Sequence, residues 1–334
     1  AQAEVTENTI WVSSVAAISL TESALGIVRD NSIADAPEVG IQAVGNSSAE
    51  ITGNTIESAG SIGISLIGNA SGTVATNQVS DRRIGVQVGG SAAPDITGNT
   101  VVRSVEVGIT FADASSGRAT ENEVSGTGAV GVLVGGTATP DLQQNKLTGN
   151  AVGMVFTADA RGAASFNTVE FNSVGVQLVG QSAPFVDGNR IADNVDAGVV
   201  FAGASSARFE RNTVLRNGEV ALEVTGTAAP AISGNEIRGA GVYGIIYRDS
   251  TAGVLAGNQI VDHVYGVQLQ GSAAPDLTDN TLEEILLTSI AYIDSSGGSA
   301  SGNSCPESLG GGITVSAPAD PTLGDNDCRV SSGG

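Results

Sequence analysis

The chain has 334 residues, of which 41% are hydrophobic and only 4% aromatic, and its formal net charge is −21. A surface this acidic repels phosphate backbones and anionic membranes, so nucleic acid is not an expected partner. No apolar run approaches the length of a membrane-spanning helix, and membrane insertion is therefore not expected.

Residues 1–30 already carry the pattern that fills the chain, and no cap helix precedes it. The opening AQAEV is compatible with what remains after signal cleavage. An open sheet edge can pair with strands of other molecules, so it is expected to be covered by other residues or continued by further coils. Either Trp11 and the opening residues cover the edge, or the chain was cut from a longer protein.

Asparagine recurs along the chain at intervals of 22 or 23 residues. Self-similarity at a fixed short period is typical of a solenoid, in which each coil packs only on its neighbours. The spacing predicts one solenoid of about 14 coils rather than two globular domains. The series is Asn8, Asn31, Asn54, Asn77, Asn99, Asn122, Asn145, Asn167, Asn189, Asn212, Asn235, Asn258, Asn280, Asn303 and Asn326.

Each coil also contains a glycine followed by alternating apolar residues, as in Ile84-Gly85-Val86-Gln87-Val88. A period of two predicts a strand with the three apolar residues inward and the glycine and middle residue outward. Apolar residues three before and two after each asparagine, such as Ile96 and Val101, predict two more short strands. The expected fold is therefore all-β.

The asparagine series itself is best explained as structural. Asparagine tolerates left-handed backbone angles, which suits the bend between the second and third strands. Stacked in register, each amide can donate to the next, so that buried polar groups satisfy one another. We therefore expect a structural Asn ladder that includes Asn54, Asn77, Asn99, Asn122, Asn145, Asn167, Asn189, Asn212, Asn235, Asn258 and Asn280.

The ladder and the G-(V/I)-x-(V/I/L/F) strand resemble the right-handed parallel β-helix repeat proteins of the pectin-lyase-like superfamily, over residues 5–303. The resemblance implies a right-handed parallel β-helix. It implies little about activity, because that superfamily includes lyases, hydrolases, epimerases, adhesins and inert scaffolds. We expect residues 1–303 to form the β-helix and residues 304–334 the last coil and a C-terminal cap.

From about residue 40 two coil types alternate, one with a proline turn and one with an aromatic residue. The aromatic positions alternate with smaller aliphatic residues, as large and small side chains do in a packed core. We therefore expect inward rings at Phe111, Phe156, Phe201, Tyr247 and Tyr292.

The third turn of the coils carries most of the charge. Asp81 is one coil before Arg103 and Asp193 is one coil before Arg216, which predicts exposed ion pairs between neighbouring coils. A second asparagine run occurs there, at Asn150, Asn172, Asn194 and Asn217. The single histidine, His263, also falls in this turn, and we expect it on a solvated corner with Tyr265 inward.

Catalytic chemistry has little support in the sequence. A general base needs a partner and a cleft, and the 22–23-residue period leaves no room for the long inserted loops that usually build one. The turn carboxylates, such as Asp95 and Asp141, recur at least two coils apart, too far to share a metal ion. No metal site and no cofactor are expected.

Cys305 and Cys328 are 23 residues apart, so they should be neighbours in adjacent coils. Strands in register lie ~4.8 Å apart, within reach of a disulfide. We predict a Cys305–Cys328 bond, and the alternative is two buried thiols in aliphatic positions. A disulfide favours an oxidising compartment, so we expect a secreted or cell-surface protein.

The middle residue of the first strand forms an outward column that is expected to expose aliphatic side chains beside glutamine. A contiguous apolar row can mark an interface. The candidate binding residues are Gln87, Leu133, Val155, Gln177, Val200, Ile246 and Gln268.

Two functions stay open. The first is a non-catalytic rod that acts as a scaffold, adhesion or binding module for a protein, for a second copy of itself or for a polysaccharide. The alternative is a polysaccharide lyase, hydrolase or epimerase that acts along the first-strand face.

Overall fold

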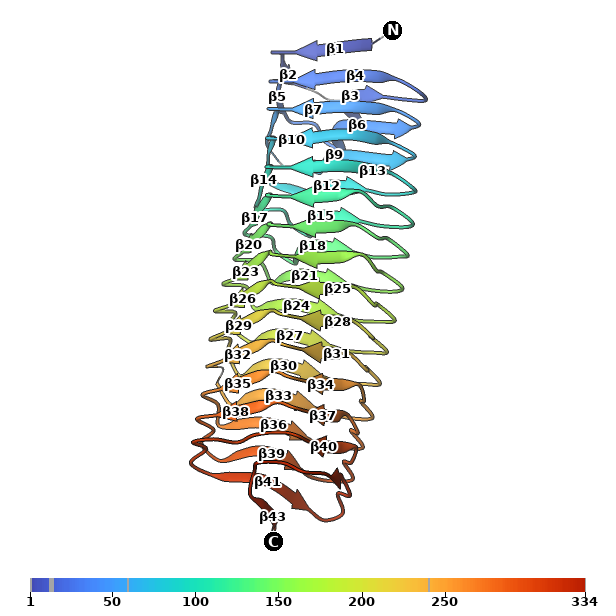
Figure 1. Ribbon diagram of the computed structural model, residues 1–334. Coiled ribbons are helices and arrows are strands. Elements are labelled where there is room, and N and C mark those ends of the chain that lie inside the picture. Colours follow the sequence, from blue (N-terminus) through green and yellow to red (C-terminus); the bar gives the residue numbers. More distant parts are fainter. Residues whose placement is uncertain (1, 12–14, 59, 240, 334) are drawn as a thin grey trace. The chain divides into compact units, whose positions relative to one another are not determined.

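The computed structural model describes residues 2–11, 15–58, 60–239 and 241–333. Every regular element in these ranges is a β-strand, and the described residues contain no helix (Figure 1). The chain divides into two compact units, Ala1–Thr168 and Val169–Gly334. In each unit most coils supply one strand to each of three parallel sheets, here named sheets A, B and C. In the C-terminal coils, isolated bridges at Ser304 and Asp327 take the place of the sheet B strand. The fold is an all-β parallel solenoid of about 14 coils.

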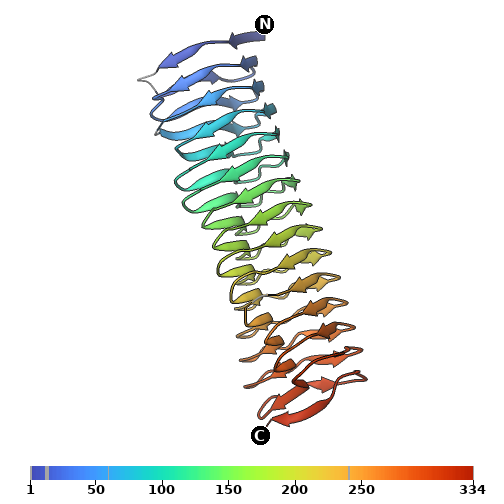
Figure 2. The ribbon, with the colours of Figure 1, turned by 90° about the vertical axis from the view of Figure 1, so that its left-hand side faces the viewer.

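The first unit contains three sheets in which strands of successive coils are hydrogen-bonded neighbours (Figure 2). Sheet A consists of β1 (Gln2–Thr6), β4 (Leu25–Arg29), β7 (Ser48–Thr52), β10 (Ser71–Ala75), β13 (Ala93–Thr97), β16 (Arg118–Thr120), β19 (Asp141–Gln143) and β22 (Ala163–Ser165). Sheet B consists of β2 (Thr9–Trp11), β5 (Ser32–Ala34), β8 (Thr55–Ile56), β11 (Gln78–Ser80), β14 (Thr100–Val102), β17 (Glu123–Ser125) and β20 (Lys146–Thr148). Sheet C consists of β3 (Ala16–Leu20), β6 (Val39–Gly45), β9 (Gly60–Gly68), β12 (Arg82–Val88), β15 (Val107–Phe111), β18 (Val130–Val134) and β21 (Val152–Phe156).

The second unit repeats this arrangement, and β23 (Thr168–Glu170) contains the boundary between the units. Sheet A consists of β25 (Phe185–Asp187), β28 (Arg208–Glu210), β31 (Ala231–Ser233), β34 (Val254–Ala256), β37 (Asp276–Thr278), β40 (Ser299–Ser301) and β42 (Thr322–Leu323). Sheet B consists of β26 (Arg190–Ala192), β29 (Thr213–Leu215), β32 (Glu236–Arg238), β35 (Gln259–Val261) and β38 (Thr281–Glu283). Sheet C consists of β24 (Val174–Leu178), β27 (Ala197–Phe201), β30 (Val220–Val224), β33 (Tyr243–Tyr247), β36 (Tyr265–Leu269), β39 (Thr288–Tyr292), β41 (Gly311–Ser316) and β43 (Val330–Gly333).

The core of each unit is a set of aliphatic columns. In sheet C of the first unit Val86 pairs in register with Ile109, and neither side chain is exposed. The aromatic residues expected to point inward are fully buried at Phe111, Phe156, Phe201, Tyr247 and Tyr292. Phe201 meets Phe209 edge-to-face, with the ring centroids 5.7 Å apart.

The Asn ladder is present in both units. The side-chain nitrogen and the backbone nitrogen of Asn54 both donate to Oδ1 of Asn77, each at 2.9 Å, and Nδ2 also reaches the carbonyl oxygen of Val28. This arrangement satisfies a buried amide completely, as the ladder prediction requires. The backbone explanation was wrong, however, because the left-handed angle belongs to the residue before the ladder asparagine in the coils from Asn8 to Asn303, as at Thr76 (φ 54°) and Arg211 (φ 52°).

The glycines of sheet C face the interior, and the expectation that they face outward was wrong. A Cβ built on Gly108 would lie 2.2 Å from Cγ1 of Val124, a core residue of sheet B. The residue after this glycine, Ile109, is also fully buried, so two successive residues point inward and the strand bends between them. The residue before the glycine then points to the outer side of the strand but is only partly exposed there, since Val107 is 9% exposed and Tyr243 is half-buried.

The Cys305–Cys328 disulfide is formed, with its Cα atoms 5.0 Å apart. Both cysteines are half-buried. In other coils the residue two after the ladder asparagine, such as Val101, is fully buried in the core, so the cysteines do not fill the core in the same way. In the described residues no helix is long and apolar enough to cross a membrane.

Candidate ligand-binding surfaces

The residues predicted to bind a partner do form columns on sheet C, but these columns do not expose a continuous apolar row. In the first unit Leu133 pairs in register with Val155, and in the second unit Ile246 pairs with Gln268. Val155 is only 7% exposed and Ile246 is fully buried, so the expectation that both are exposed was wrong. Gln87, Leu133, Gln177, Val200 and Gln268 are half-buried.

The burial of Ile246 comes from its neighbours on the same face. Ile246 lies in register between Glu223 and Gln268. Arg248, the first residue after β33, reaches back to Glu223, with its Nε atom 2.9 Å from Oε1. Long polar side chains often cover apolar surface with their aliphatic stems. Here they convert an aliphatic outward residue into a buried one.

Two tyrosines stand on the same outer face of the second unit. Tyr243 and Tyr265 each precede the inward glycine of their strand, and their rings stack with centroids 5.5 Å apart and planes 18° apart. Both are half-buried, so the expected inward placement of Tyr265 was wrong. The pair could have been found in the sequence as aromatic residues that precede the glycine in two successive coils.

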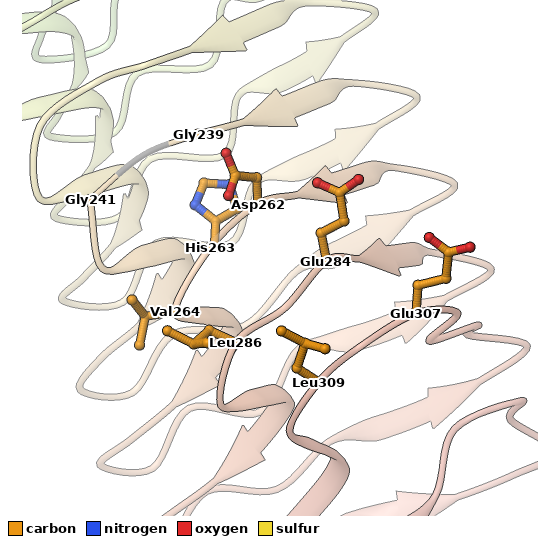
Figure 3. A pocket seen from close by; sticks show the side chains of 9 residues that line it. All are labelled: Gly239, Gly241, Asp262, His263, Val264, Glu284, Leu286, Glu307 and Leu309. Carbon is orange, nitrogen blue, oxygen red and sulfur yellow. The ribbon is translucent and has the colours of Figure 1, made fainter.

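A groove of about 740 Å³ lies along the turn between sheets B and C of the second unit (Figure 3). One side carries the carboxylates of Asp262, Glu284 and Glu307, and the other carries the aliphatic side chains of Val264, Leu286 and Leu309. The sequence interpretation missed this groove. The only indication of it in the sequence was a series of acidic residues that are one coil apart, with no basic residue among them.

His263 lies between these two rows and is only 3% exposed, so its predicted place on a solvated corner was wrong. It occupies an inward position of the third turn, against Gly244, where a Cβ would lie 3.0 Å from Cδ2 of His263. The second asparagine run occupies equivalent positions, with Nδ2 of Asn194 donating to Oδ1 of Asn217 at 2.8 Å. The histidine is thus a buried polar residue at the position that asparagine occupies in other coils.

The predicted ion pairs of the third turn are formed. Arg103 binds the carboxylate of Asp81 with two nitrogens, and Arg216 binds Asp193 in the same way. The hydrogen bonds from Arg103 hold the pKa of the Asp81 carboxyl below its usual range. In the part of the chain that the structure describes, no group of three or more His, Cys, Asp or Glu residues is placed to hold a metal ion.

The family model of the right-handed β-helix region matches residues 1–152, 107–229 and 220–334. The chain belongs to the right-handed β-helix family. Among the curated proteins none matches this β-helix significantly in sequence.

The comparison with solved structures found matches, all at low sequence identity. The periplasmic alginate epimerase AlgG has 13% identity and a TM-score of 0.60, covering 92% of this chain and 78% of its own. The catalytic unit of a thermostable GH87 alpha-1,3-glucanase from Streptomyces thermodiastaticus strain HF3-3 has 10% identity and a TM-score of 0.36, covering 99% and 63%. PfbA, a surface adhesin of Streptococcus pneumoniae, has 10% identity and a TM-score of 0.29, covering 98% and 82%. The epimerase shows a shared fold and nothing more, and the other two similarities carry no argument.

Proposed function

We propose that this β-helix is a non-catalytic binding module that holds a polysaccharide against the outer face of sheet C in its second unit. The observation that carries the proposal is the stacked pair Tyr243–Tyr265 on that face. Tyrosine combines an apolar ring with a hydroxyl group, which suits a ligand with both apolar and hydroxyl-bearing faces. The amide of Gln268, next to the pair on the same strand as Tyr265, adds a donor and an acceptor.

A polysaccharide fits this face better than a second protein does. Protein interfaces rely on an apolar centre, and the burial of Val155 and Ile246 removes the apolar row that would have provided one. The half-buried glutamines and the tyrosine pair remain, and such polar groups orient a hydroxyl-rich ligand. The net charge of −21 favours a neutral glycan over a polyanion.

The disulfide and the periplasmic location stated for AlgG support an extracytoplasmic location for this β-helix. Residues 304–334 act in this proposal as the last coil and cap of the binding module. Two strands of this segment continue sheet C: β41 pairs with β39 of the preceding coil, and β43 pairs with β41.

The second candidate is a lyase, hydrolase or epimerase that acts on a polysaccharide along the same face. The observation that favours it is Glu223, a carboxylate beside the guanidinium of Arg248 on the sheet C surface. A carboxylate and a cation are the kinds of group that acid–base chemistry on a sugar uses.

A binding screen against neutral and acidic polysaccharides tests the proposal. Wild-type protein should bind a neutral glycan, and Tyr243→Ala combined with Tyr265→Ala should weaken that binding by about tenfold or more. Phe171→Ala, which removes an exposed ring elsewhere in the same unit, is the matched control and should change nothing. Binding that survives the tyrosine substitutions, or no binding at all, would contradict the proposal. Release of reducing ends or unsaturated products would establish the second candidate instead.

A further inference from the structure

The acidic row of the groove belongs to a column in which two other acids, Asp81 and Asp193, have arginine partners. The residues that follow the sheet B strands form this column, and the backbone is left-handed at Asp81, Asp193 and Asp262 (φ 56–63°). Asp81 and Asp193 are each followed one coil later by an arginine, whose guanidinium binds the carboxylate at 2.6–2.9 Å. This column therefore neutralises its own acids in two places.

Asp262, in contrast, is followed by two more acids. Val261 pairs in register with Glu283, which places Asp262 next to Glu284, and the Thr281–Ser304 bridge places Glu307 one coil further. Parallel strands lie ~4.8 Å apart, so three like charges are stacked at a distance at which they repel one another. In the described part of the chain none of the three forms an ion pair with an arginine or lysine.

The opposite side of the groove is apolar and open to solvent. Val264, Leu286 and Leu309 occupy equivalent positions in three successive coils, and the backbone nitrogen of Leu286 donates to the carbonyl of His263 at 2.9 Å. Leu286 is 51% exposed and Leu309 is 82% exposed. Large aliphatic side chains this exposed, and next to each other, typically mark a contact surface.

We infer that the groove binds a basic peptide segment of a partner protein, with its cationic side chains on the acidic row and its apolar side chains on the aliphatic row. Charge complementarity identifies the occupant. A guanidinium from the partner would take the place that Arg103 and Arg216 fill elsewhere in the column, and would relieve the repulsion among the three carboxylates.

The two rows also fit the shape of an extended chain. Successive side chains of an extended peptide point to opposite sides, so alternating basic and apolar residues meet both rows at once. Side chains on one side recur every ~6.7 Å, and the three coils span ~10 Å. Two basic residues separated by one apolar residue therefore cover the acidic row.

Titration calorimetry with a capped peptide of alternating arginine and leucine tests the inference. Wild-type protein should bind it, and Glu284→Gln combined with Glu307→Gln should weaken binding by about tenfold or more. Glu38→Gln combined with Glu121→Gln removes two exposed charges elsewhere and should leave the affinity unchanged. A peptide of alternating glutamate and leucine should not bind. Equal losses of peptide affinity in the two double variants would show that net charge alone causes the effect, and would overturn the inference.

Replacing one acid with arginine distinguishes two causes of lost peptide binding: a site that is already filled by a guanidinium, and a site that has only lost negative charge. Glu284→Arg places a guanidinium one coil after Asp262, as Arg103 follows Asp81, so it should raise the melting temperature and abolish peptide binding together. Leu309→Ser should weaken binding of the arginine–leucine peptide without changing the melting temperature. Calcium at about 1 mM is the competing occupant. If calcium alone stabilises the wild type but not the Glu284→Gln, Glu307→Gln variant, and displaces the peptide, the row is a metal site and the inference is wrong.

Discussion

Nη1 of Arg82 donates to the carbonyl oxygen of Ala36, 46 residues earlier in the chain, at 2.5 Å. Nη2 of the same side chain donates to the carbonyl oxygen of Glu57 at 3.0 Å. With a coil of 22–23 residues, one guanidinium thus connects three successive coils of the first unit. Arg82 is completely buried, and this burial lowers its pKa from the ordinary value, an effect that the nearby carboxylate of Asp35 partly offsets.

Arg82→Ala should lower the free energy of unfolding by about 3 kcal/mol or more, because it leaves the carbonyl group of the buried Ala36 without its partner and opens a cavity. Arg83→Ala is the matched control, since Arg83 is exposed and pairs with Glu106 on the surface. It should cost no more than about 1 kcal/mol. Urea unfolding of the two variants provides the comparison, and similar losses would contradict a special role for Arg82.

Gly108→Ala should destabilise the first unit by on the order of 1–3 kcal/mol, because the new Cβ would press on Val124 and on the carbonyl oxygen of Gly131. If the glycine faced outward, the added methyl group would not lower the stability. Gly135→Ala is the control, since the nearest atom to a Cβ there is 3.5 Å away, in ordinary contact. Thermal unfolding should separate the two variants, and equal melting temperatures would restore the outward assignment.

Periodicity predicted the coils, the three strands, the Asn ladder and the ion pairs, because each of these repeats with the coil. One group of errors concerns local direction. Alternation alone placed Gly108 outward, but the strand bends at the glycine and two successive residues face inward. A pattern of period two contains no information about such a bend, so Tyr265 was assigned to the wrong face with it.

The burial of Ile246 and His263 could not be predicted for a different reason. Both depend on what neighbouring side chains cover, namely the reach of Arg248 to Glu223 and the space left by the inward Gly244. Such coverage follows from side-chain conformations in three dimensions. The groove was missed because its two rows become visible only after the register of three coils is known.

Phe201→Ala should cost about 3–5 kcal/mol, since the ring is fully buried and loses its edge-to-face contact with Phe209. Phe209→Ala and the double variant complete a cycle. The two losses should not be additive, with a coupling of about 0.5–1.5 kcal/mol from the ring pair. Unchanged thermal stability in the single variants would refute the inward assignment.

Replacing both Cys305 and Cys328 with serine should destabilise the C-terminal coils of the second unit. The bond closes a loop of 23 residues, for which chain entropy gives about 3 kcal/mol. Hydrogen exchange should rise in β41 and β43 and remain unchanged in β24 to β30. Mass spectrometry of the unreduced protein checks the premise, because two alkylatable thiols after unfolding would show that the bond is absent.

Asp249 should make the stability of the second unit depend on pH. Its Oδ2 accepts hydrogen bonds from the hydroxyl of Thr225 at 2.6 Å and from the backbone nitrogen of Gly226 at 2.8 Å, and these bonds lower the pKa of the carboxyl. A carboxyl whose pKa is lowered by folding stabilises the protein above its usual range, near 3.8, and this contribution is lost as the pH falls through the folded-state pKa. Asp249→Asn keeps an acceptor and tolerates the left-handed backbone at φ 58°, so it removes the charge alone. The melting temperature of the variant should lie below that of the wild type at neutral pH, and the difference should disappear at low pH. A difference that stays constant with pH would mean that the charge of Asp249 contributes nothing.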